Sequence, residues 1–356
     1  MKKLYPLLIF STLMLPFAGK SQERQEPEQA VGYKLLRNEP AKSGLVGVSV
    51  EPVSIDVSKL NVNVGGGFTL YYTFNSLLRI SGGYRYAYLD NFVNENHKDE
   101  PVGDWDSYGI PYKHEKSSCL SFLVSPTIFS WVKEKEYGVV LGRTGYRTIA
   151  VTHVPGNVMK ALTGRLGYMV DNRVIESKDG LSFKTTASPY MYHYQDQYMA
   201  DQTLVLTPDN LNTSATIMKS NIAVIGVAYT AFHDLKVALR DSRFSGTRLE
   251  SRQTDFFFDF LYANQIKLQD MIYYHSVYVP GVGGGHLPQR LDLSATPLRK
   301  TGFRLGFQVA SMYSSHFGTK FALEGGVRPG VKPVGGSASV YGQITFGFLF
   351  GGRIAN

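Results

Sequence analysis

The stretch Ser339–Phe350 (SVYGQITFGFLF) alternates apolar and polar residues, and this pattern decides the fold class. One face carries Val340, Ile344, Phe346, Phe348 and Phe350, and the other carries Tyr341, Gln343, Thr345 and Gly347. Residues 302–313 and 320–328 alternate in the same way. A period of two predicts strands that have one face against an apolar phase. That phase is the core in a soluble sandwich and lipid in a transmembrane barrel, where the polar face lines the lumen.

The N-terminus has the pattern of a secretory signal peptide. Lys2 and Lys3 precede the apolar run 4–17, and the small residues Gly19 and Ser21 follow it. Two prolines interrupt the run, which is too short to span a membrane as a helix. The sequence therefore predicts an exported protein whose signal peptide ends at Ser21.

The composition favours an all-β chain and argues against several other classes. Aromatic residues make up 13% of the 356 residues, with 23 Tyr and 21 Phe, and 36 glycines punctuate the chain. The single cysteine, Cys119, excludes a disulfide framework and a lipoprotein anchor. The formal net charge of +8 comes without a Lys/Arg-rich run or a stacking motif, which argues against nucleic-acid binding.

Fourteen candidate strands follow the signal peptide, an even number, as in single-chain bacterial barrels. They cover residues 43–55, 60–73, 77–89, 118–131, 137–149, 161–170, 181–194, 219–232, 234–242, 252–263, 268–279, 302–313, 319–328 and 338–350. The alternation is weakest at 43–55, 181–194 and 234–242, so twelve or sixteen strands also fit the pattern.

The predicted connections alternate in length. Short polar segments occupy 74–76, 132–136, His233 and 314–319, whereas the alternate connections are long and occupy 90–117, 150–160, 195–218 and 280–301. Short periplasmic turns and long extracellular loops are typical of outer-membrane barrels. The predicted organisation is a signal peptide (1–21), a periplasmic segment (22–42) and an antiparallel transmembrane β-barrel (43–356), with both termini in the periplasm.

Charged residues within the strands fall on the face opposite the apolar one. The predicted lumen-facing residues are Arg79, Arg85, Arg165, Lys236, Arg240, Asp255, Asp259, Arg304, Lys320, Glu324, Arg328 and Gln343. Basic residues outnumber acidic ones, so one interpretation is a cationic constriction that favours anionic solutes. The alternative is a lumen filled by ion pairs that hold the barrel in shape. The predicted strand number does not decide between the two interpretations. Side chains fill the interior of eight-stranded barrels, whereas barrels of sixteen to eighteen strands leave an aqueous channel.

Two loops carry residues of functional interest, and neither predicts a site. The Gly-rich segment 281–288 (GVGGGHLP) lacks the Gly-Lys-Ser/Thr ending of a phosphate loop. The acidic loop 90–117 has a spacing that matches no EF-hand. We predict no metal, no cofactor and no catalytic residue, since neither a Gly-x-Ser-x-Gly elbow nor a His-Glu-x-x-His motif is present.

The signal-like segment Leu4–Ser21, the asymmetry of the loops and the closing strand Ser339–Phe350 together resemble those of Gram-negative outer-membrane β-barrels, a class that includes porins, fatty-acid-type channels and accessory barrels. The resemblance implies an integral outer-membrane protein in contact with lipid and lipopolysaccharide. Such proteins commonly end on an aromatic residue, whereas GGRIAN follows Phe350 here. Either the last strand extends to Ile354 or the recognition signal is loose.

The leading functional hypothesis is a non-enzymatic scaffold or accessory subunit of a larger outer-membrane complex, with other outer-membrane or periplasmic proteins as partners. The alternative is a pore with a cationic lumen that passes small anionic solutes. A third hypothesis is a membrane-embedded lipid-modifying enzyme, which would need a Ser–His pair at the membrane face. A soluble exported sandwich is the competing fold.

Overall fold

The computed structural model describes residues 33–40, 43–58, 62–74, 77–90, 109–111, 116–144, 147–176, 184–186, 215–240, 245–269, 271–279, 283–294, 296–332 and 340–355. The predicted signal peptide lies outside the described residues. The described residues contain no helix that is long and apolar enough to cross a membrane.

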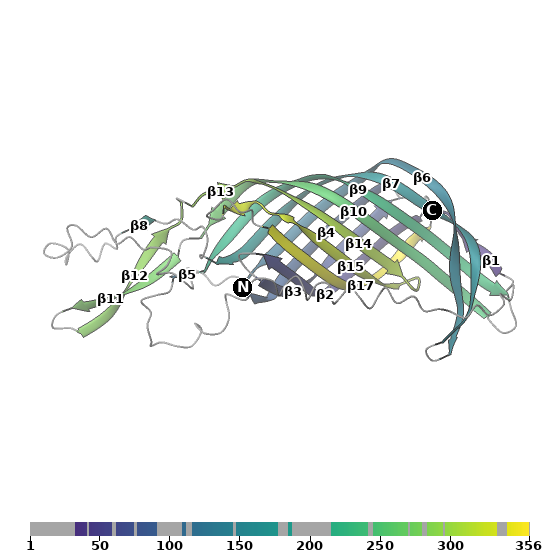
Figure 1. Ribbon diagram of the computed structural model, residues 1–356, viewed down its shortest axis with the longest axis horizontal. Coiled ribbons are helices and arrows are strands. Elements are labelled where there is room, and N and C mark those ends of the chain that lie inside the picture. Colours follow the sequence, from purple (N-terminus) through teal and green to yellow (C-terminus); the bar gives the residue numbers. More distant parts are fainter. Residues whose placement is uncertain are drawn as a thin grey trace, which may run out of the picture.

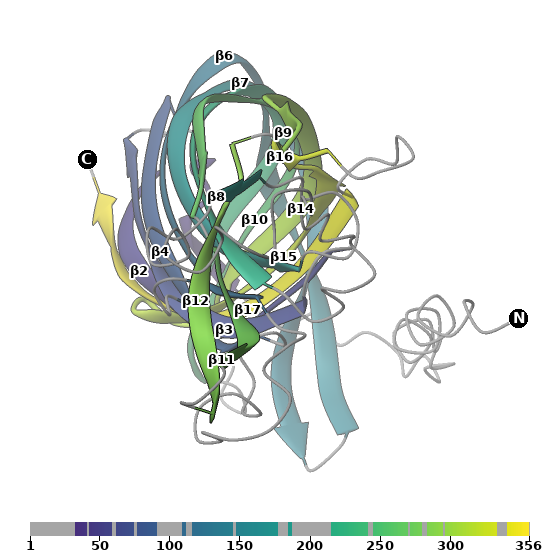
Figure 2. The same ribbon diagram turned by 90° about the vertical axis from the view of Figure 1, so that its left-hand side faces the viewer.

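Ten strands of the described chain close into an antiparallel β-barrel (Figures 1 and 2). Around the barrel their order is β9-β10-β14-β15-β17-β2-β3-β4-β6-β7, and β7 pairs with β9 to close the ring. Their bounds are β2 Ser43–Ser58, β3 Val62–Phe74, β4 Leu78–Asp90, β6 Ser118–Thr144, β7 Arg147–Glu176, β9 Ala215–Arg240, β10 Ser245–Leu268, β14 Thr301–Met312, β15 Phe317–Val327 and β17 Val340–Ala355.

The expected all-β barrel is confirmed, but its strand count is ten rather than fourteen. The segment 132–136 and His233, predicted as turns, lie inside the long strands β6 and β9. The predicted strand 268–279 instead forms β11 (Met271–Val279), which pairs outside the barrel. Of the predicted strand 181–194, only β8 (Lys184–Thr186) is among the described residues, and it too lies outside the barrel.

The two ends of the barrel differ in the length of their connections. At one end, here called the short-turn end, the gaps between barrel strands are 75–77, 145–146, 241–244 and 313–316. At the other, the long-loop end, the chain passes through the three long connections 91–117, 177–214 and 269–300, and also through 59–61 and 328–339. The barrel begins at Ser43 and ends at Ala355, both at the short-turn end, because Ala355 pairs with Ser43. The last strand therefore continues through Ile354, one of the two alternatives above.

The three long connections meet in a small sheet beyond the long-loop end. β5 (Gly109–Pro111), β11, β12 (Gly283–Asp292) and β8 form one antiparallel sheet in the order β5-β11-β12-β8. The Gly-rich segment predicted as a loop thus contains the start of β12. A second short pair joins β13 (Leu298–Arg299) to β16 (Gly330–Val331). Figure 1 shows β11 and β12 projecting away from the barrel.

The outer face of the barrel is apolar. Leu305 and Phe256 are 56% and 52% exposed, whereas Asp259 on the inner face is fully buried. The exposed large hydrophobic side chains continue around the ring on β2, β3, β4, β7 and β15. An apolar band outside a polar interior is the arrangement of a transmembrane barrel and the reverse of a soluble one.

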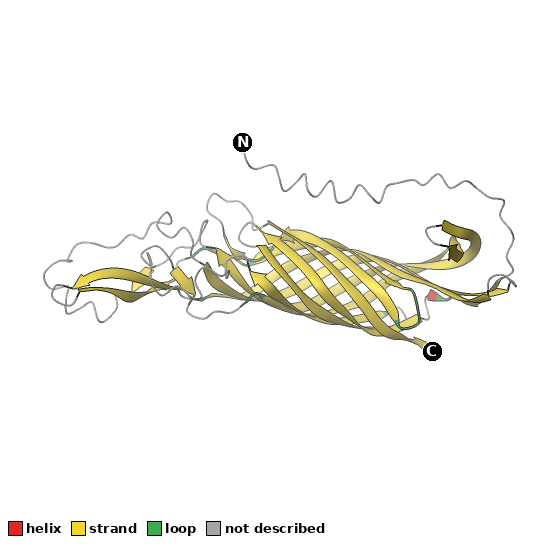
Figure 3. Ribbon diagram, turned by 90° about the horizontal axis from the view of Figure 1, so that it is seen from below, coloured by secondary structure: helices red, strands yellow, loops and turns green. Residues whose placement is uncertain are grey.

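Paired parts of β6 and β7, and of β9 and β10, continue beyond the barrel at the short-turn end, where Figure 3 shows strands projecting from the ring. β7 follows β9 only as far as the pair Val158–His233, and β1 (Tyr33–Arg37) then takes its place along β9. The far part of the β6–β7 hairpin, the paired ends of β9 and β10, and β1 are here called the extension. Its hydrophobic cluster is formed by Tyr137, Val139, Val154, Val158, Leu235, Val237 and Leu239. Burial, with the charge of Glu250 nearby, raises the pKa of Tyr137 to about 12.

If the apolar band contacts lipid, Leu305→Arg will destabilise the folded barrel by about 2–4 kcal/mol, because it places a cation near the middle of a strand. Tyr313→Arg, at the end of β14, is the matched control and should cost about 0–1 kcal/mol. Urea unfolding in lipid vesicles measures both. Equal losses for the two variants would contradict a lipid-facing band.

The extension should unfold independently of the barrel. Val154→Asp places a charge in the hydrophobic cluster, where a buried valine contributes about 1.5–3 kcal/mol. We expect faster limited proteolysis within 129–160, while the heat-modifiable gel migration of the barrel is retained. Glu134→Gln, an exposed position of the same hairpin, should leave both measurements unchanged. Loss of the heat-modifiable band in Val154→Asp would show that barrel and extension fold as one unit.

Candidate functional site in the barrel interior

At the centre of the interior, two arginines share one carboxylate. Arg165 Nε lies 2.8 Å from Asp259 Oδ1, and Arg304 Nε lies 2.8 Å from Asp259 Oδ2. Arg165 Nη2 adds a hydrogen bond of 3.1 Å to Oδ2, so its guanidinium binds both oxygens. Asp259 is fully buried, and removing one partner of such a pair typically costs about 3–5 kcal/mol.

A glycine makes the central contact possible. Gly226 of β9 stands between Arg165 of β7 and Asp259 of β10 in the strand register. A Cβ atom on Gly226 would collide with Asp259 Oδ1 and with the Phe258 carbonyl oxygen. Without a side chain at this position, Arg165 reaches over β9 to the carboxylate.

Phe257 supports the two arginines from inside the lumen. Its ring centroid lies 4.3 Å from Arg165 Cζ and 5.6 Å from Arg304 Cζ, within the range of cation–π contacts. Gly306 on the neighbouring strand leaves room for this ring, because a Cβ there would overlap Phe257 Cζ. The central charges are therefore held by packing as well as by ion pairing.

The network continues toward the long-loop end through Glu324 and Arg328. Arg304 Nη1 lies 3.5 Å from Glu324 Oε2, and Arg328 Nη2 lies 3.9 Å from Glu324 Oε1. Arg328 Nη1 makes a closer contact of 2.6 Å with Asp56 Oδ2. Arg328 also donates to Gln343 Oε1 at 3.2 Å. Arg328 thus has two carboxylates within reach, one bound tightly and one loosely.

Two further ion pairs lie nearer the short-turn end. Lys320 Nζ lies 2.7 Å from Glu51 Oε1, again across a glycine, Gly347, whose Cβ would stand 3.0 Å from Glu51 Cγ. Arg79 Nη1 of β4 lies 2.9 Å from Asp255 Oδ2 of β10. β4 and β10 are not neighbours in the barrel, so this pair crosses the lumen.

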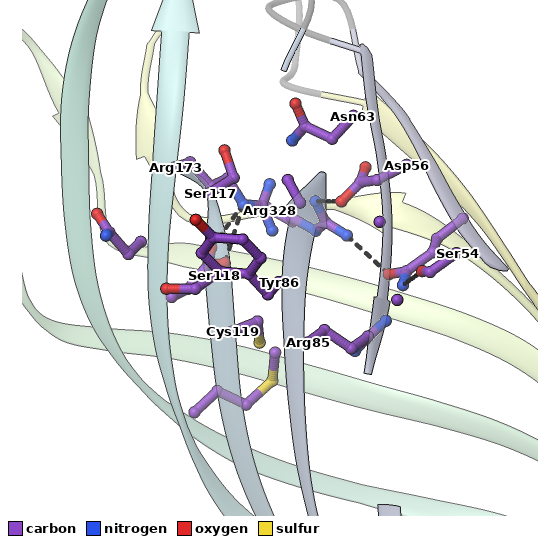
Figure 4. A pocket seen from close by; sticks show the side chains of 17 residues that line it. Ser54, Asp56, Asn63, Arg85, Tyr86, Ser117, Ser118, Cys119, Arg173 and Arg328 are labelled. Atoms are coloured by element: carbon purple, nitrogen blue, oxygen red, sulfur yellow. Dashed lines mark hydrogen bonds and ion pairs between the residues drawn. The ribbon is translucent and has the colours of Figure 1, made fainter. Parts of the chain in front are cut away.

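Small cavities separate the charged layers. An outer cavity of about 60 Å³, shown in Figure 4, lies near the long-loop end and is lined by Asp56, Arg85, Cys119 and Arg328 among others. A central cavity of about 110 Å³ is lined by Arg85, Arg165, Arg304, Lys320, Glu51 and Glu324 among others. An inner cavity of about 40 Å³ lies near the short-turn end beside Arg79 and Thr230. Each can hold water, which needs roughly 10–15 Å³ per molecule.

The structure brings together most of the residues predicted to face the lumen. Nine belong to the contacts above: Arg79, Arg165, Asp255, Asp259, Arg304, Lys320, Glu324, Arg328 and Gln343. Arg85 lines two cavities without joining those contacts. Lys236 does not line the interior: it lies in the extension, where β9 pairs with β1 opposite Arg37. The side chain of Arg240 lies outside the described residues.

Sequence reasoning missed three interior acids, Glu51 and Asp56 on β2 and Asp171 on β7. A β-bulge between Glu51 and Ser54, at Pro52, shifts the alternation of β2 by one residue. Ser49 and Glu51 point inward before it, and Ser54 and Asp56 after it. With the pair of Asp171 and Arg173 beside the outer cavity included, six acids stand beside seven bases in the described interior, which is nearly neutral rather than cationic. Two exposed residues in succession, at 52 and 53, are the signal of the bulge.

No family model matches this chain, and no curated protein matches it. Six chains of solved structures match, among them a chain described as the CymD monoaromatic hydrocarbon channel. That match has 9% identity, covers 88% of this chain and 89% of the other, and has a TM-score of 0.27. With so low a TM-score, it supports no conclusion about function. Among the described residues, no group of His, Cys, Asp and Glu could hold a metal ion.

The glycine beneath the central contact gives a sharp test of the network. Gly226→Ala should destabilise the barrel by about 1–3 kcal/mol, because the new methyl displaces Asp259 from Arg165. Gly342→Ala is the matched control: no atom lies within 4 Å of its Cβ position, and its change should stay within about 0.5 kcal/mol. Urea unfolding midpoints compare the two, and similar midpoints would show that the central contact contributes little.

Proposed function

We propose that the protein is an outer-membrane channel of narrow bore, closed in this conformation by layers of ion pairs. The observation that carries the proposal is the series of cavities along the lumen, each bordered by charged side chains. Arg79 and Asp255 lie between the central and inner cavities, and Arg85 stands between the central and outer ones. Side chains, rather than a folded plug of the described chain, fill the space between cavities.

Ion pairs are suited to a gate because their partners can exchange. Arg328 binds Asp56 at 2.6 Å and lies 3.9 Å from Glu324, so a small rotation of its side chain moves it from one carboxylate to the other. Such an exchange keeps the charge compensated, which avoids the large cost of a buried unpaired ion. The cavities limit the passage to small hydrophilic solutes, since the largest of the three that we describe is about 110 Å³.

The proposed orientation follows from the ends of the barrel. With the short-turn end in the periplasm, both Ser43 and Ala355 lie there, and so does the extension. The sheet formed by β5, β11, β12 and β8 then faces the cell exterior.

Removal of two ion-pair layers tests the channel. Two double variants replace both members of an ion pair by serine, so that neither pair leaves one unpaired partner behind. They are Arg79→Ser with Asp255→Ser, and Asp56→Ser with Arg328→Ser. We expect little steady current from the wild type in planar bilayers, a higher conductance in each double variant and the highest in the quadruple variant. Arg37→Ser with Asp234→Ser removes a pair of the extension and is the control, with wild-type behaviour expected. A silent quadruple variant that still shows heat-modifiable migration would reject the channel.

The second candidate is a non-conducting barrel that anchors a partner protein. The observation that favours it is the extension, whose cluster is buried independently of the barrel. Exposed Lys133, Glu134, Lys135 and Glu136 on its β6 edge would meet a partner in the periplasm. Purification in mild detergent distinguishes the candidates: a partner that is lost with Val154→Asp, together with a silent quadruple variant, supports the anchor.

A further inference from the structure

Arg85 is the exception among the interior cations. Arg79, Arg165, Arg304, Lys320 and Arg328 each have a carboxylate oxygen within 2.9 Å. Within the described part of the chain, no ion pair or hydrogen bond engages the Arg85 guanidinium. Glu324 and Glu51 interact electrostatically with Arg85, but Glu51 accepts a hydrogen bond from Lys320, and Glu324 contacts Arg304. A cation in this position favours a negatively charged ligand.

The central cavity that Arg85 faces has an excess of positive charge. Four bases line it, Arg85, Arg165, Arg304 and Lys320, against two acids, Glu51 and Glu324. Uncharged polar side chains complete the wall: Gln308 and Thr345 can donate hydrogen bonds to a ligand, whereas the hydroxyls of Thr69 and Ser121 already donate to Glu51 and to the Gly83 carbonyl oxygen. At about 110 Å³ the cavity holds several water molecules, or a small oxyanion in their place.

The backbone leaves room for Arg85 to reach a ligand. A Cβ on Gly67 would stand 2.9 Å from Arg85 Cγ, so the arginine stem lies over a glycine. Gly83 separates the hydroxyls of Thr69 and Ser121, which would stand 3.2 and 3.3 Å from a Cβ at that position. These two glycines keep the wall of the cavity open where a side chain would fill it.

We infer that Arg85 anchors a binding site for a small oxyanion, of the size of inorganic phosphate, in the central cavity. The planar guanidinium presents two parallel N–H donors to two oxygens of such an anion. Lys320 and Arg304 face the same space and add positive charge. Arg85 also lines the outer cavity, so it borders both cavities on the path from the long-loop end. This inference rests on the proposed channel and gives it a substrate class.

Equilibrium dialysis of the full-length protein in detergent against labelled inorganic phosphate tests the site. We expect saturable binding to the wild type, and a loss of affinity of about tenfold in Arg85→Gln, which lacks the charge-assisted hydrogen bonds. Arg85→Lys should retain part of the affinity. Lys135→Gln, which removes an exposed positive charge from the extension, should bind like the wild type. Wild-type affinity in Arg85→Gln, or no saturable binding to the wild type, would overturn the inference.

Thermal unfolding separates a binding role from a structural one. Because no carboxylate of the described residues lies at ion-pair distance from Arg85, Arg85→Gln should unfold close to the wild-type temperature without phosphate, and phosphate should raise the unfolding temperature of the wild type alone. A less stable Arg85→Gln barrel without phosphate would make Arg85 a structural residue and contradict the site. Neither measurement depends on current, so phosphate binding in a silent barrel would reject the channel and keep the site. Conductance without phosphate binding would keep the channel and reject the site.

Discussion

The sharing of Asp259 by Arg165 and Arg304 is the interaction on which the interior depends. A closed barrel with an apolar outer face must place its charges inside, where few water molecules solvate them. The solution is to compensate each charge with another across the lumen or across a strand. Gly226 permits the contact by leaving the intervening strand bare, and Gly347 does the same between Lys320 and Glu51. Glycine thus acts here through the space it leaves rather than through its backbone freedom.

The ion pairs of the interior lie in successive layers along the lumen, and this arrangement determines the space between the layers. Side chains that reach across the lumen meet in pairs, and the gaps between successive pairs become cavities of limited size. A lumen built in this way is closed by side chains of the described residues, and in the proposed channel it would open when ion-pair partners exchange. Arg85 has no carboxylate at ion-pair distance among the described residues, although Glu324 and Glu51 act on it electrostatically, and it contributes to the excess of basic over acidic side chains around the central cavity.

The sequence predicted the class of fold and much of the interior, for a physical reason. Where a strand crosses the barrel without a bulge, as β14 and β15 do, alternation places Arg304 and Lys320 correctly opposite Leu305 and Phe321. The strand number was wrong because the extension carries strands into water, so that polar residues such as 132–136 looked like a turn. Glu51 and Asp56 were missed because one bulge shifts the alternation of β2 by one residue, so that the inward-facing positions before and after it do not follow one period of two. Contacts across the lumen, such as that of Arg79 with Asp255, depend on the closed ring and have no signal along the chain.

The single cysteine gives the most direct test of a lumen closed between cavities. Cys119 lines the outer cavity beside Arg85 (Figure 4), on the long-loop side of the central layer. A small membrane-impermeant thiol reagent can be added to either side of a bilayer that holds the oriented protein, and the rate of labelling of Cys119 measured from each. We predict labelling from the long-loop side and none from the short-turn side. Equal rates from both sides would show an open lumen, and no labelling from either would show that the outer cavity is sealed; each result would contradict this account.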